Sequence, residues 1–331
     1  MHLLVTQSFG RENEYRRALF TILSFWAWYS GPTNQVKTVL FTDNPDFFRP
    51  YLTDIEVEYV LLTPEKIRVM RGQIDFLHRM KIALIEEAFQ RNPGAHMLYV
   101  DSDTFFTADA LPWIRTFRPG RSFMHLLEYP YEECRNLPLP MGVTFHAFLR
   151  LIEEQSFQTS RGTEHYTPQQ ESWNAGVMGL PAETLALIPD VYQLTDQFYP
   201  PTQNHASEQY AFSLVLQTRT ELERCDQYVY HYWYRVKKQI TDLILAEYFT
   251  PQFRSQPWAE KLRVARKITQ RLPQDYEQHP LMLQDNAVQA FNEDRFKEGY
   301  RQAWLALRKS PFTPSFLKDV LYHAKRHITQ A

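Results

Sequence analysis

The sequence has only two cysteines and no long apolar segment. Cys134 and Cys225 make no C-x-x-C pair and no disulfide framework, so nothing indicates an oxidising compartment. No stretch reaches the ~18 apolar residues of a membrane-spanning helix, and the chain does not open on a basic region followed by an apolar run. We therefore expect a soluble, cytoplasmic protein.

The sequence also lacks a large excess of positive or negative charge. The 36 Lys and Arg against 38 Asp and Glu give a net charge of −2, which excludes a general polyanion binder and so argues against nucleic acid as a partner. The segment 297–331 is the exception, because seven basic residues there oppose two acidic ones among scattered aromatic residues. The simpler interpretation is a set of helices packed on the rest of the protein. The alternative is peripheral contact with anionic lipid at the inner face of a membrane.

Short apolar runs alternate with helical periodicity over the first two-thirds of the chain. Strands are predicted at 3–5, 36–42, 55–62, 97–100, 121–127, 173–180 and 227–232, and helices at 14–28, 76–90 and 207–216. This alternation predicts an α/β fold with a mixed, mostly parallel sheet flanked by helices. After about residue 240 the pattern is helical with Pro-rich connections, so we expect an α/β domain over 1–240 and a helical C-terminal extension over 241–331.

One predicted strand, at residues 97–100, runs directly into Asp101 and Asp103. Ligands bind at the carboxyl ends of parallel strands in open α/β sheets, and residues i and i+2 of an extended segment point the same way. Both carboxylates can therefore face one hard divalent cation, Mn²⁺ or Mg²⁺, which would bridge the phosphates of a nucleotide. The simpler interpretation is a turn at the end of the strand, where Asp is common.

Three further motifs follow in the chain. Asn174-Ala175-Gly176 opens an apolar segment, and its small residues allow close approach of a ligand to the backbone. Glu208-Gln209 lie in the first turn of a predicted helix, which is also what an ordinary helix start looks like. His231 ends a predicted strand six residues before Lys237. A single histidine there is more often structural. A cation held by Asp101 and Asp103 needs a third protein ligand, however, and this favours His231 as a metal ligand.

The order of these motifs resembles that of the GT-A glycosyltransferases, and most closely glycosyltransferase family 8, whose members are retaining, metal-dependent enzymes that use UDP-sugars. The resemblance spans roughly residues 1–240. It implies a Rossmann-like GT-A fold for that part of the chain. Two departures from the family pattern stand out: Tyr234 replaces the glycine of the family's H-x-x-G-x-x-K motif, and Glu208 replaces an aspartate.

The resemblance also implies roles for individual residues. The implied ligands of Mn²⁺ or Mg²⁺ are Asp101, Asp103 and His231. The implied catalytic residues, which lie against the donor sugar, are Asn174, Glu208 and Gln209. The implied nucleotide-sugar contacts are Thr6, Asp43, Arg79, Lys81, Ser102 and Lys237.

The implied activity is transfer of a hexose from a nucleotide-diphosphate sugar, with UDP as the implied nucleotide, to a saccharide or lipid-linked acceptor, as in polysaccharide biosynthesis. We interpret the irregular residues 129–170 as the part that shapes the acceptor site. Two alternatives stay open at this point. One is a phosphatase of the haloacid dehalogenase type, for which Asp101-Ser102-Asp103-Thr104 would supply the D-x-D-x-T motif. The other is a non-catalytic protein that binds nucleotide sugars.

Overall fold

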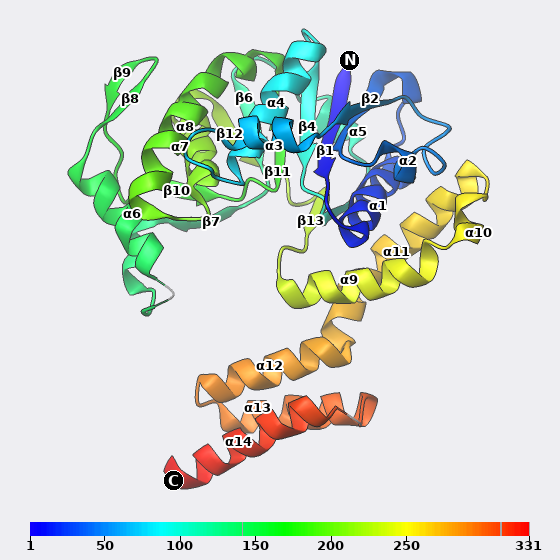
Figure 1. The fold of residues 1–331 in the computed structure, drawn as a ribbon, viewed down its shortest axis with the longest axis vertical. Coiled ribbons are helices and arrows are strands. Elements are labelled where there is room, and N and C mark those ends of the chain that lie inside the picture. Colours follow the sequence, from blue (N-terminus) through cyan, green and yellow to red (C-terminus); the bar gives the residue numbers. More distant parts are fainter. Residues whose placement is uncertain (141, 312, 331) are drawn as a thin grey trace.

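A mixed β-sheet forms the centre of the computed structural model, which describes residues 1–140, 142–311 and 313–330 (Figure 1). In this described part of the chain the sheet has seven strands in the order β12-β6-β11-β4-β1-β2-β3. β4, β1, β2 and β3 are parallel, as are β6 and β12, whereas β11 is antiparallel to both of its neighbours. The strands are β1 (His2–Ser8), β2 (Val36–Thr42), β3 (Val57–Leu61), β4 (His96–Val100), β6 (Arg121–Met124), β11 (Val177–Leu180) and β12 (Glu221–Arg224). The predicted mixed, mostly parallel sheet is confirmed.

The described residues also form three separate two-stranded antiparallel sheets. β5 (Thr104–Phe106) pairs with β13 (Val229–His231), and β7 (Leu127–Pro130) pairs with β10 (Glu171–Trp173). β8 (Phe157–Thr159) and β9 (Gly162–Glu164) form a hairpin at the edge of the molecule (Figure 1). The pairing of β13 with β5 is the one that matters for the site, because it brings residue 231 beside residues 101–104.

Helices cover both faces of the sheet, because its central strands are apolar on both sides. In β4, Met97 and Tyr99 pack into one buried cluster, while Leu98 and Val100 pack into the other, as the alternation of side chains along a strand requires. The first cluster is covered by α4 (Arg79–Arg91), α6 (Val143–Glu154), α7 (Ile188–Thr202) and α8 (Ser207–Arg219). The second is covered by α1 (Glu12–Trp28), α9 (Arg235–Tyr248) and α11 (Trp258–Gln278).

Short helices connect these elements. They are η1 (Thr33–Gln35), α2 (Pro45–Phe48), α3 (Pro64–Arg71), α5 (Leu111–Ile114), η2 (Tyr131–Asn136), η3 (Ala182–Leu187) and α10 (Pro251–Arg254). Among the residues that the structure describes, no helix combines the length with the apolar character that crossing a membrane requires.

The last three helices form a lobe of their own at one end of the molecule (Figure 1). They are α12 (Pro280–Asn292), α13 (Phe296–Lys309) and α14 (Pro314–Gln330), and we call them the C-terminal lobe. They share a small apolar cluster in which Phe291 and Phe316 are buried. Gly299 allows the close approach of α13 to α12, because a β-carbon there would overlap the ring of Phe291. The predicted helical character of the C-terminal part is confirmed, and residues 312 and 331 of that prediction lie outside the described residues.

The boundary between domains that we expected at residue 240 stays a prediction. α9 and α11 lie in the same apolar cluster as α1, so this part of the helical segment packs directly on the sheet domain. The C-terminal lobe starts only at Pro280 and contacts the rest through α12, where Asp285 accepts a hydrogen bond from the hydroxyl of Tyr234.

Candidate active site at the sheet edge

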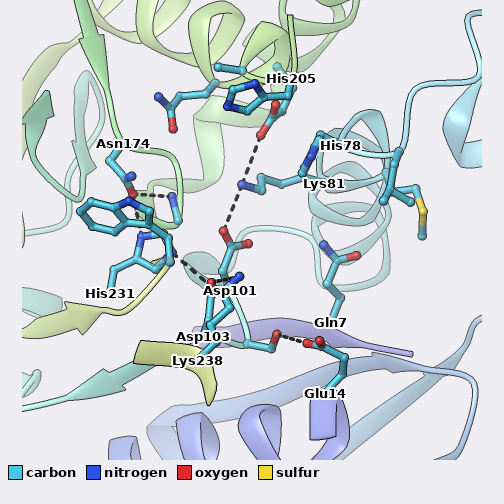
Figure 2. A pocket seen from close by; sticks show the side chains of 18 of the residues that line it. Gln7, Glu14, His78, Lys81, Asp101, Asp103, Asn174, His205, His231 and Lys238 are labelled. Carbon is cyan, nitrogen blue, oxygen red and sulfur yellow. Dashed lines mark hydrogen bonds and ion pairs between the residues drawn. The ribbon is translucent and has the colours of Figure 1, made fainter. Parts of the chain in front are cut away.

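A cavity of about 760 Å³ opens at the carboxyl ends of β1 and β4 (Figure 2). Gln7 and Ser8 reach it from the end of β1, and Asp101 and Asp103 from the loop after β4. β11 runs antiparallel to β4, with Val177 opposite Val100. The residues that precede β11 therefore lie at the same edge as those that follow β4, and Asn174 and Gly176 join the cavity lining. Glu208, Gln209, His231 and Lys238 complete it from α8, β13 and α9.

Asp101, Asp103 and His231 converge in this cavity. They offer one ligand atom each, and these atoms all lie within 4.8 Å of one another. Nε2 of His231 is 3.3 Å from Oδ1 of Asp103, and β13 holds the histidine there because it pairs residue by residue with β5. Two carboxylates and an imidazole make a donor set that divalent cations accept. The residues present therefore fit the predicted metal.

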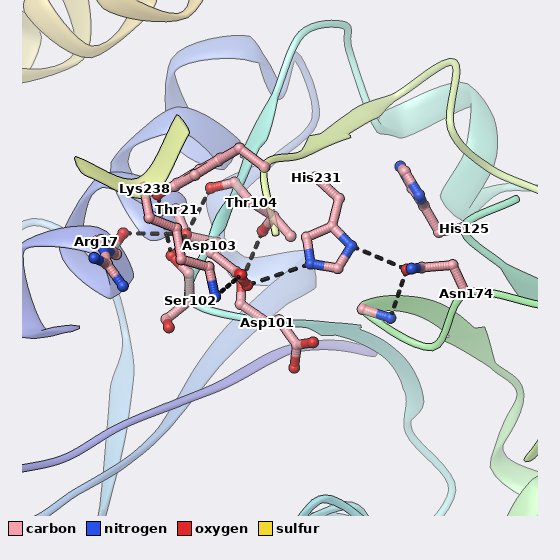
Figure 3. A network of polar contacts seen from close by, with 12 residues as sticks. Arg17, Thr21, Asp101, Ser102, Asp103, Thr104, His125, Asn174, His231 and Lys238 are labelled. Atoms are coloured by element: carbon pink, nitrogen blue, oxygen red, sulfur yellow. Dashed lines mark hydrogen bonds and ion pairs between the residues drawn. The ribbon is translucent and has the colours of Figure 1, made fainter. Parts of the chain in front are cut away.

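The hydrogen bonds of Asn174 set the orientation of the His231 ring (Figure 3). Nδ2 of Asn174 donates to Glu128 (2.8 Å), so its Oδ1 is the atom that accepts from the backbone N–H of Gly176 (3.0 Å). The same Oδ1 lies 2.9 Å from Nδ1 of His231. Nδ1 must then carry a proton, which leaves Nε2 of the neutral ring with the free lone pair that a metal ligand needs.

Gly176 provides the space that this ring occupies. A β-carbon at position 176 would overlap the ring atoms of His231. The glycine also anchors the loop after β4, because its carbonyl oxygen accepts a hydrogen bond from the backbone N–H of Asp101 (2.7 Å). The N-A-G motif therefore shapes the metal site through its backbone and its lack of a side chain.

Each aspartate of the D-x-D motif is paired with a lysine. Nζ of Lys238 is 2.6 Å from Oδ2 of Asp103, and Nζ of Lys81 is 3.3 Å from both Asp101 and Glu208. Burial opposes the charged form of Asp103, but the positive charges of His231, in its protonated form, and of Lys238 outweigh that effect and hold the pKa of this carboxyl well below its usual value. Burial likewise opposes the charge of Lys81, but the carboxylates of Asp101 and Glu208 raise its pKa.

The inner cavity has an excess of negative charge. Asp101, Asp103, Glu128 and Glu208 carry four negative charges, against two positive charges on Lys81 and Lys238. Arg11 and Glu14, which also line the cavity, cancel each other. With His231 neutral, the net charge is −2, which a divalent cation would balance.

Glu208 has one oxygen without a partner. Its side chain is almost fully buried at the start of α8, and Oε1 lies near Lys81, whereas Oε2 is a buried atom that accepts no hydrogen bond among the described residues. A buried carboxylate oxygen left in this state is costly, and the residue that carries it lines the cavity. The site therefore offers an acceptor for a hydroxyl or amide group of a ligand.

Gln209 is held rigidly beside Glu208. Its Nε2 donates to Glu128 (2.8 Å) and Ser172 (3.1 Å), and its Oε1 accepts from the backbone N–H of Ala175 (3.2 Å).

The sequence analysis did not identify Glu128 as a site residue. It lies in β7, just after the predicted strand 121–127, so the rule that led to Asp101, a polar residue at the end of a strand, could also have found it.

Most of the predicted site residues meet in the cavity. The ones that line it are Lys81, Asp101, Ser102, Asp103, Asn174, Glu208, Gln209 and His231. The ones outside the lining are Thr6, Asp43, Arg79 and Lys237. Thr6 is fully buried in β1. Asp43 accepts hydrogen bonds from the N–H of Gly10 (3.0 Å) and the hydroxyl of Tyr15 (2.8 Å), so it braces the loop at the cavity rim.

Two predicted donor contacts point elsewhere. The guanidinium of Arg79 pairs with Asp196 (2.8 Å) and lies over the ring of Tyr192, between α4 and α7. Nζ of Lys237 donates to the hydroxyl of Tyr230 (2.8 Å). Lys238 reaches the cavity instead, because α9 begins at Arg235 and successive residues of a helix point in different directions.

No family model matches the sequence, and no curated protein matches it either. Solved structures do match the fold. Mouse xyloside xylosyltransferase 1 is 14% identical, with 68% of this chain and 84% of that chain covered and a TM-score of 0.44. The glycosyltransferase GlyE of Streptococcus pneumoniae is 11% identical, with 80% and 63% covered and a TM-score of 0.47. The galactosyltransferase LgtC, solved with donor and acceptor sugar analogs, is 11% identical, with 83% and 99% covered and a TM-score of 0.46. All three of these structures are of glycosyltransferases.

Proposed function

We propose that the chain is a metal-dependent, retaining glycosyltransferase that moves a hexose from a UDP-sugar to a saccharide or lipid-linked acceptor. The observation that carries the proposal is the buried Oε2 of Glu208, which has no hydrogen-bond partner among the described residues and whose side chain lines the same cavity as the Asp101–Asp103–His231 group. A nucleotide sugar needs both features at once: a cation site for its diphosphate and a hydrogen-bond acceptor for its sugar hydroxyls.

The leaving diphosphate would be bound by the charged side of the cavity. Asp101, Asp103 and His231 would hold Mn²⁺ or Mg²⁺, which when bound supplies positive charge for the diphosphate oxygens. Lys238 lies beside Asp103 and adds a second positive charge at the same place. Charge that is already in position stabilises a transition state in which negative charge builds on the leaving group.

The sugar would be held by the opposite wall. Oε2 of Glu208 would accept a hydrogen bond from a sugar hydroxyl, while Gln209, which Glu128 and Ala175 keep in place, would lie against the reactive face. The acceptor hydroxyl attacks the anomeric carbon from the side that the diphosphate leaves. The bond from the anomeric carbon to the phosphate oxygen breaks, the new glycosidic bond forms, and the departing phosphate oxygen takes the proton of the acceptor.

The contacts of Asp101 do not decide between the glycosyltransferase and the phosphatase. Oδ1 of Asp101 accepts the hydroxyl of Tyr99 and Oδ2 pairs with Lys81, and a metal ligand and a nucleophile would both need one of these oxygens. Burial and this aspartate together raise the pKa of Tyr99 well above its usual value, so the hydroxyl remains a donor to Asp101.

The test separates nucleotide binding from sugar transfer. Thermal unfolding is measured with UDP, GDP and ADP, with and without Mn²⁺, on the unchanged protein and on the variants Asp103→Ala and Glu208→Gln. A ligand that binds the native state raises its melting temperature. We expect stabilisation by UDP that requires Mn²⁺, persists in Glu208→Gln and is lost in Asp103→Ala.

Hydrolysis of UDP-glucose and UDP-galactose is then followed by the release of UDP. Glu208→Gln should bind UDP normally yet release it from the sugar at least about tenfold more slowly, since a charged hydrogen bond is worth ~1.5–3 kcal/mol. No stabilisation by any nucleotide would refute the donor site. Release of phosphate from simple phosphomonoesters would favour the phosphatase, and binding without hydrolysis or transfer would favour a non-catalytic binding protein.

A further inference from the structure

α14 carries apolar side chains on two different faces. The inner face packs on the rest of the C-terminal lobe, where Phe316 is buried and the ring of His323 stacks on Phe291. The outer face is apolar as well, although it is open to solvent. Leu317, Leu321 and Ile328 are 38%, 69% and 78% exposed.

These three side chains form one stripe. They are four and seven residues apart, the spacing that places residues on the same face of a helix. We call them the outer stripe. Single exposed apolar residues are normal on protein surfaces, whereas several of them on one face of a helix indicate a partner that covers that face.

Basic residues border the outer stripe on one side. Lys318, Tyr322 and Lys325 are four and three residues apart, so they form a second row along the same helix, and all three are exposed. Neither lysine forms an ion pair within the described residues. Arg326 and Arg301, by contrast, form ion pairs with Asp294 and Glu298, so part of their charge is already neutralised within the protein.

We propose that the outer face of α14 binds an anionic membrane surface, with the outer stripe entering the lipid and Lys318 and Lys325 at the headgroups. An apolar row beside a row of lysines and a tyrosine is the composition of helices that lie in the plane of a membrane interface. The position of α14 suits this role, because it is the outermost helix of a lobe at the end of the molecule farthest from the sheet (Figure 1).

This inference does not depend on the proposed enzyme activity. The positive charge of the segment favours an anionic surface over a second copy of the same basic helix, since like charges would then face each other. If the acceptor of the proposed transfer is lipid-linked, the same contact would keep the chain at the surface where that acceptor resides.

The test is co-sedimentation of the full chain with vesicles of phosphatidylcholine alone and with vesicles in which part of it is replaced by phosphatidylglycerol. We expect binding to the anionic vesicles and little binding to the neutral ones. A lysine near an anionic surface contributes about fivefold in affinity. Lys318→Gln together with Lys325→Gln should therefore weaken binding roughly 25-fold, and Leu321→Glu should weaken it at least as much.

Matched controls lie on other helices. Leu243 on α9 is 52% exposed and Lys267 on α11 is exposed, so Leu243→Glu and Lys267→Gln change similar surface positions away from α14 and should leave vesicle binding unchanged. Circular dichroism checks that each variant is folded. Absence of binding to anionic vesicles, or binding that the α14 variants leave intact, overturns the proposal. Self-association of the chain that Leu321→Glu abolishes, with no vesicle binding, would show that a second copy covers the stripe.

Discussion

At the scale of single residues, Gly176 and His231 must be considered together, because the ring of one fills the space that the other leaves. We expect Gly176→Ala to push the imidazole away from Asp101 and Asp103 and to weaken Mn²⁺ binding at least about tenfold, the lower end of what a lost supporting contact costs a metal site. Isothermal calorimetry with Mn²⁺ measures this.

A matched control is available in the C-terminal lobe. Gly299→Ala creates a similar overlap, with the ring of Phe291, so it should lower stability without changing the affinity for Mn²⁺. Normal Mn²⁺ affinity in Gly176→Ala would contradict the assignment of His231 as a ligand.

Lys237 and Lys238 are neighbours with different surroundings, and this gives a second prediction. Lys238 lies 2.6 Å from Asp103 in the cavity, whereas Lys237 donates to Tyr230 outside it. If Lys238 stabilises the leaving diphosphate, Lys238→Ala should lower kcat of sugar transfer by roughly 100-fold or more, as loss of a positioned donor does elsewhere. Lys237→Ala should change kcat far less. A larger loss of kcat in Lys237→Ala than in Lys238→Ala would favour Lys237, the lysine that the family motif implies, as the diphosphate contact.

The sequence could predict which motifs meet, but not which side chain of a helix turns toward the cavity. Asp101, Asp103 and His231 were predictable because each lies at the end of a strand, where direction is fixed by the sheet. The choice between Lys237 and Lys238 depends on the residue at which α9 begins. That start is set by contacts such as the one between Tyr234 and Asp285, which link segments far apart in the chain.

At the scale of secondary structure, His2 of β1 and His96 of β4 form a pair that is sensitive to pH. They are partners in the parallel register. Burial and the neighbouring His96 lower the pKa of His2 to about 4, and burial also lowers the pKa of His96. In addition, Nδ1 of His96 accepts a hydrogen bond from the N–H of Ala182 (3.2 Å), which protonation of that nitrogen would remove.

The sign of the effect follows from proton binding. Below the unfolded pKa of about 6.5 the unfolded chain binds protons at these two positions that the folded chain does not. The free energy of unfolding should therefore fall as the pH decreases from about 6.5 toward 4. Urea unfolding at a series of pH values measures it. His2→Asn and His96→Asn should each flatten the slope, and His165→Asn, at an exposed position, should not. An unchanged slope in both β-strand variants would contradict the pKa direction.

The central strands were predictable because burial on both faces produces apolar runs. β2 spans the predicted residues, and β4 differs from its prediction by one. The segment 173–180 was predicted as one strand but forms β10 and β11, since the N-A-G loop separates two different pairings. The antiparallel direction of β11 could not be predicted, because side chains alternate between the two faces of a sheet in the same way whichever direction the strand runs. Residues 129–170 were read as irregular, yet they contain α6 and the β8–β9 hairpin.

At the scale of the whole molecule, the C-terminal lobe has a much smaller core than the sheet domain. Its cluster contains six buried residues among those described, whereas each face of the sheet is covered by a far larger one. Regions with few buried apolar contacts open at a lower free energy than the global unfolding. We expect amides of α13 and α14 to exchange with deuterium well before those of β1 and β4. Hydrogen exchange read by mass spectrometry checks this, and equal protection of both parts would contradict it.

That the C-terminal part is helical was visible in the sequence, but where a separate lobe begins was not. The pattern changes near residue 240, and α9 and α11 nevertheless pack on α1. Only contacts between distant segments distinguish a helix that covers the sheet from one that belongs to the lobe.

The candidate site draws its side chains from segments that are far apart in the chain, from residues 7–14 at one end to residues 231–238 at the other. Residues 231–238 leave the ribosome after all the other segments that line the site. A nascent chain can already display its D-x-D motif while it still lacks His231 and Lys238. Under the proposed function, capture of a donor would begin only after β13 has paired with β5, and an incomplete or misfolded product would not consume nucleotide sugar.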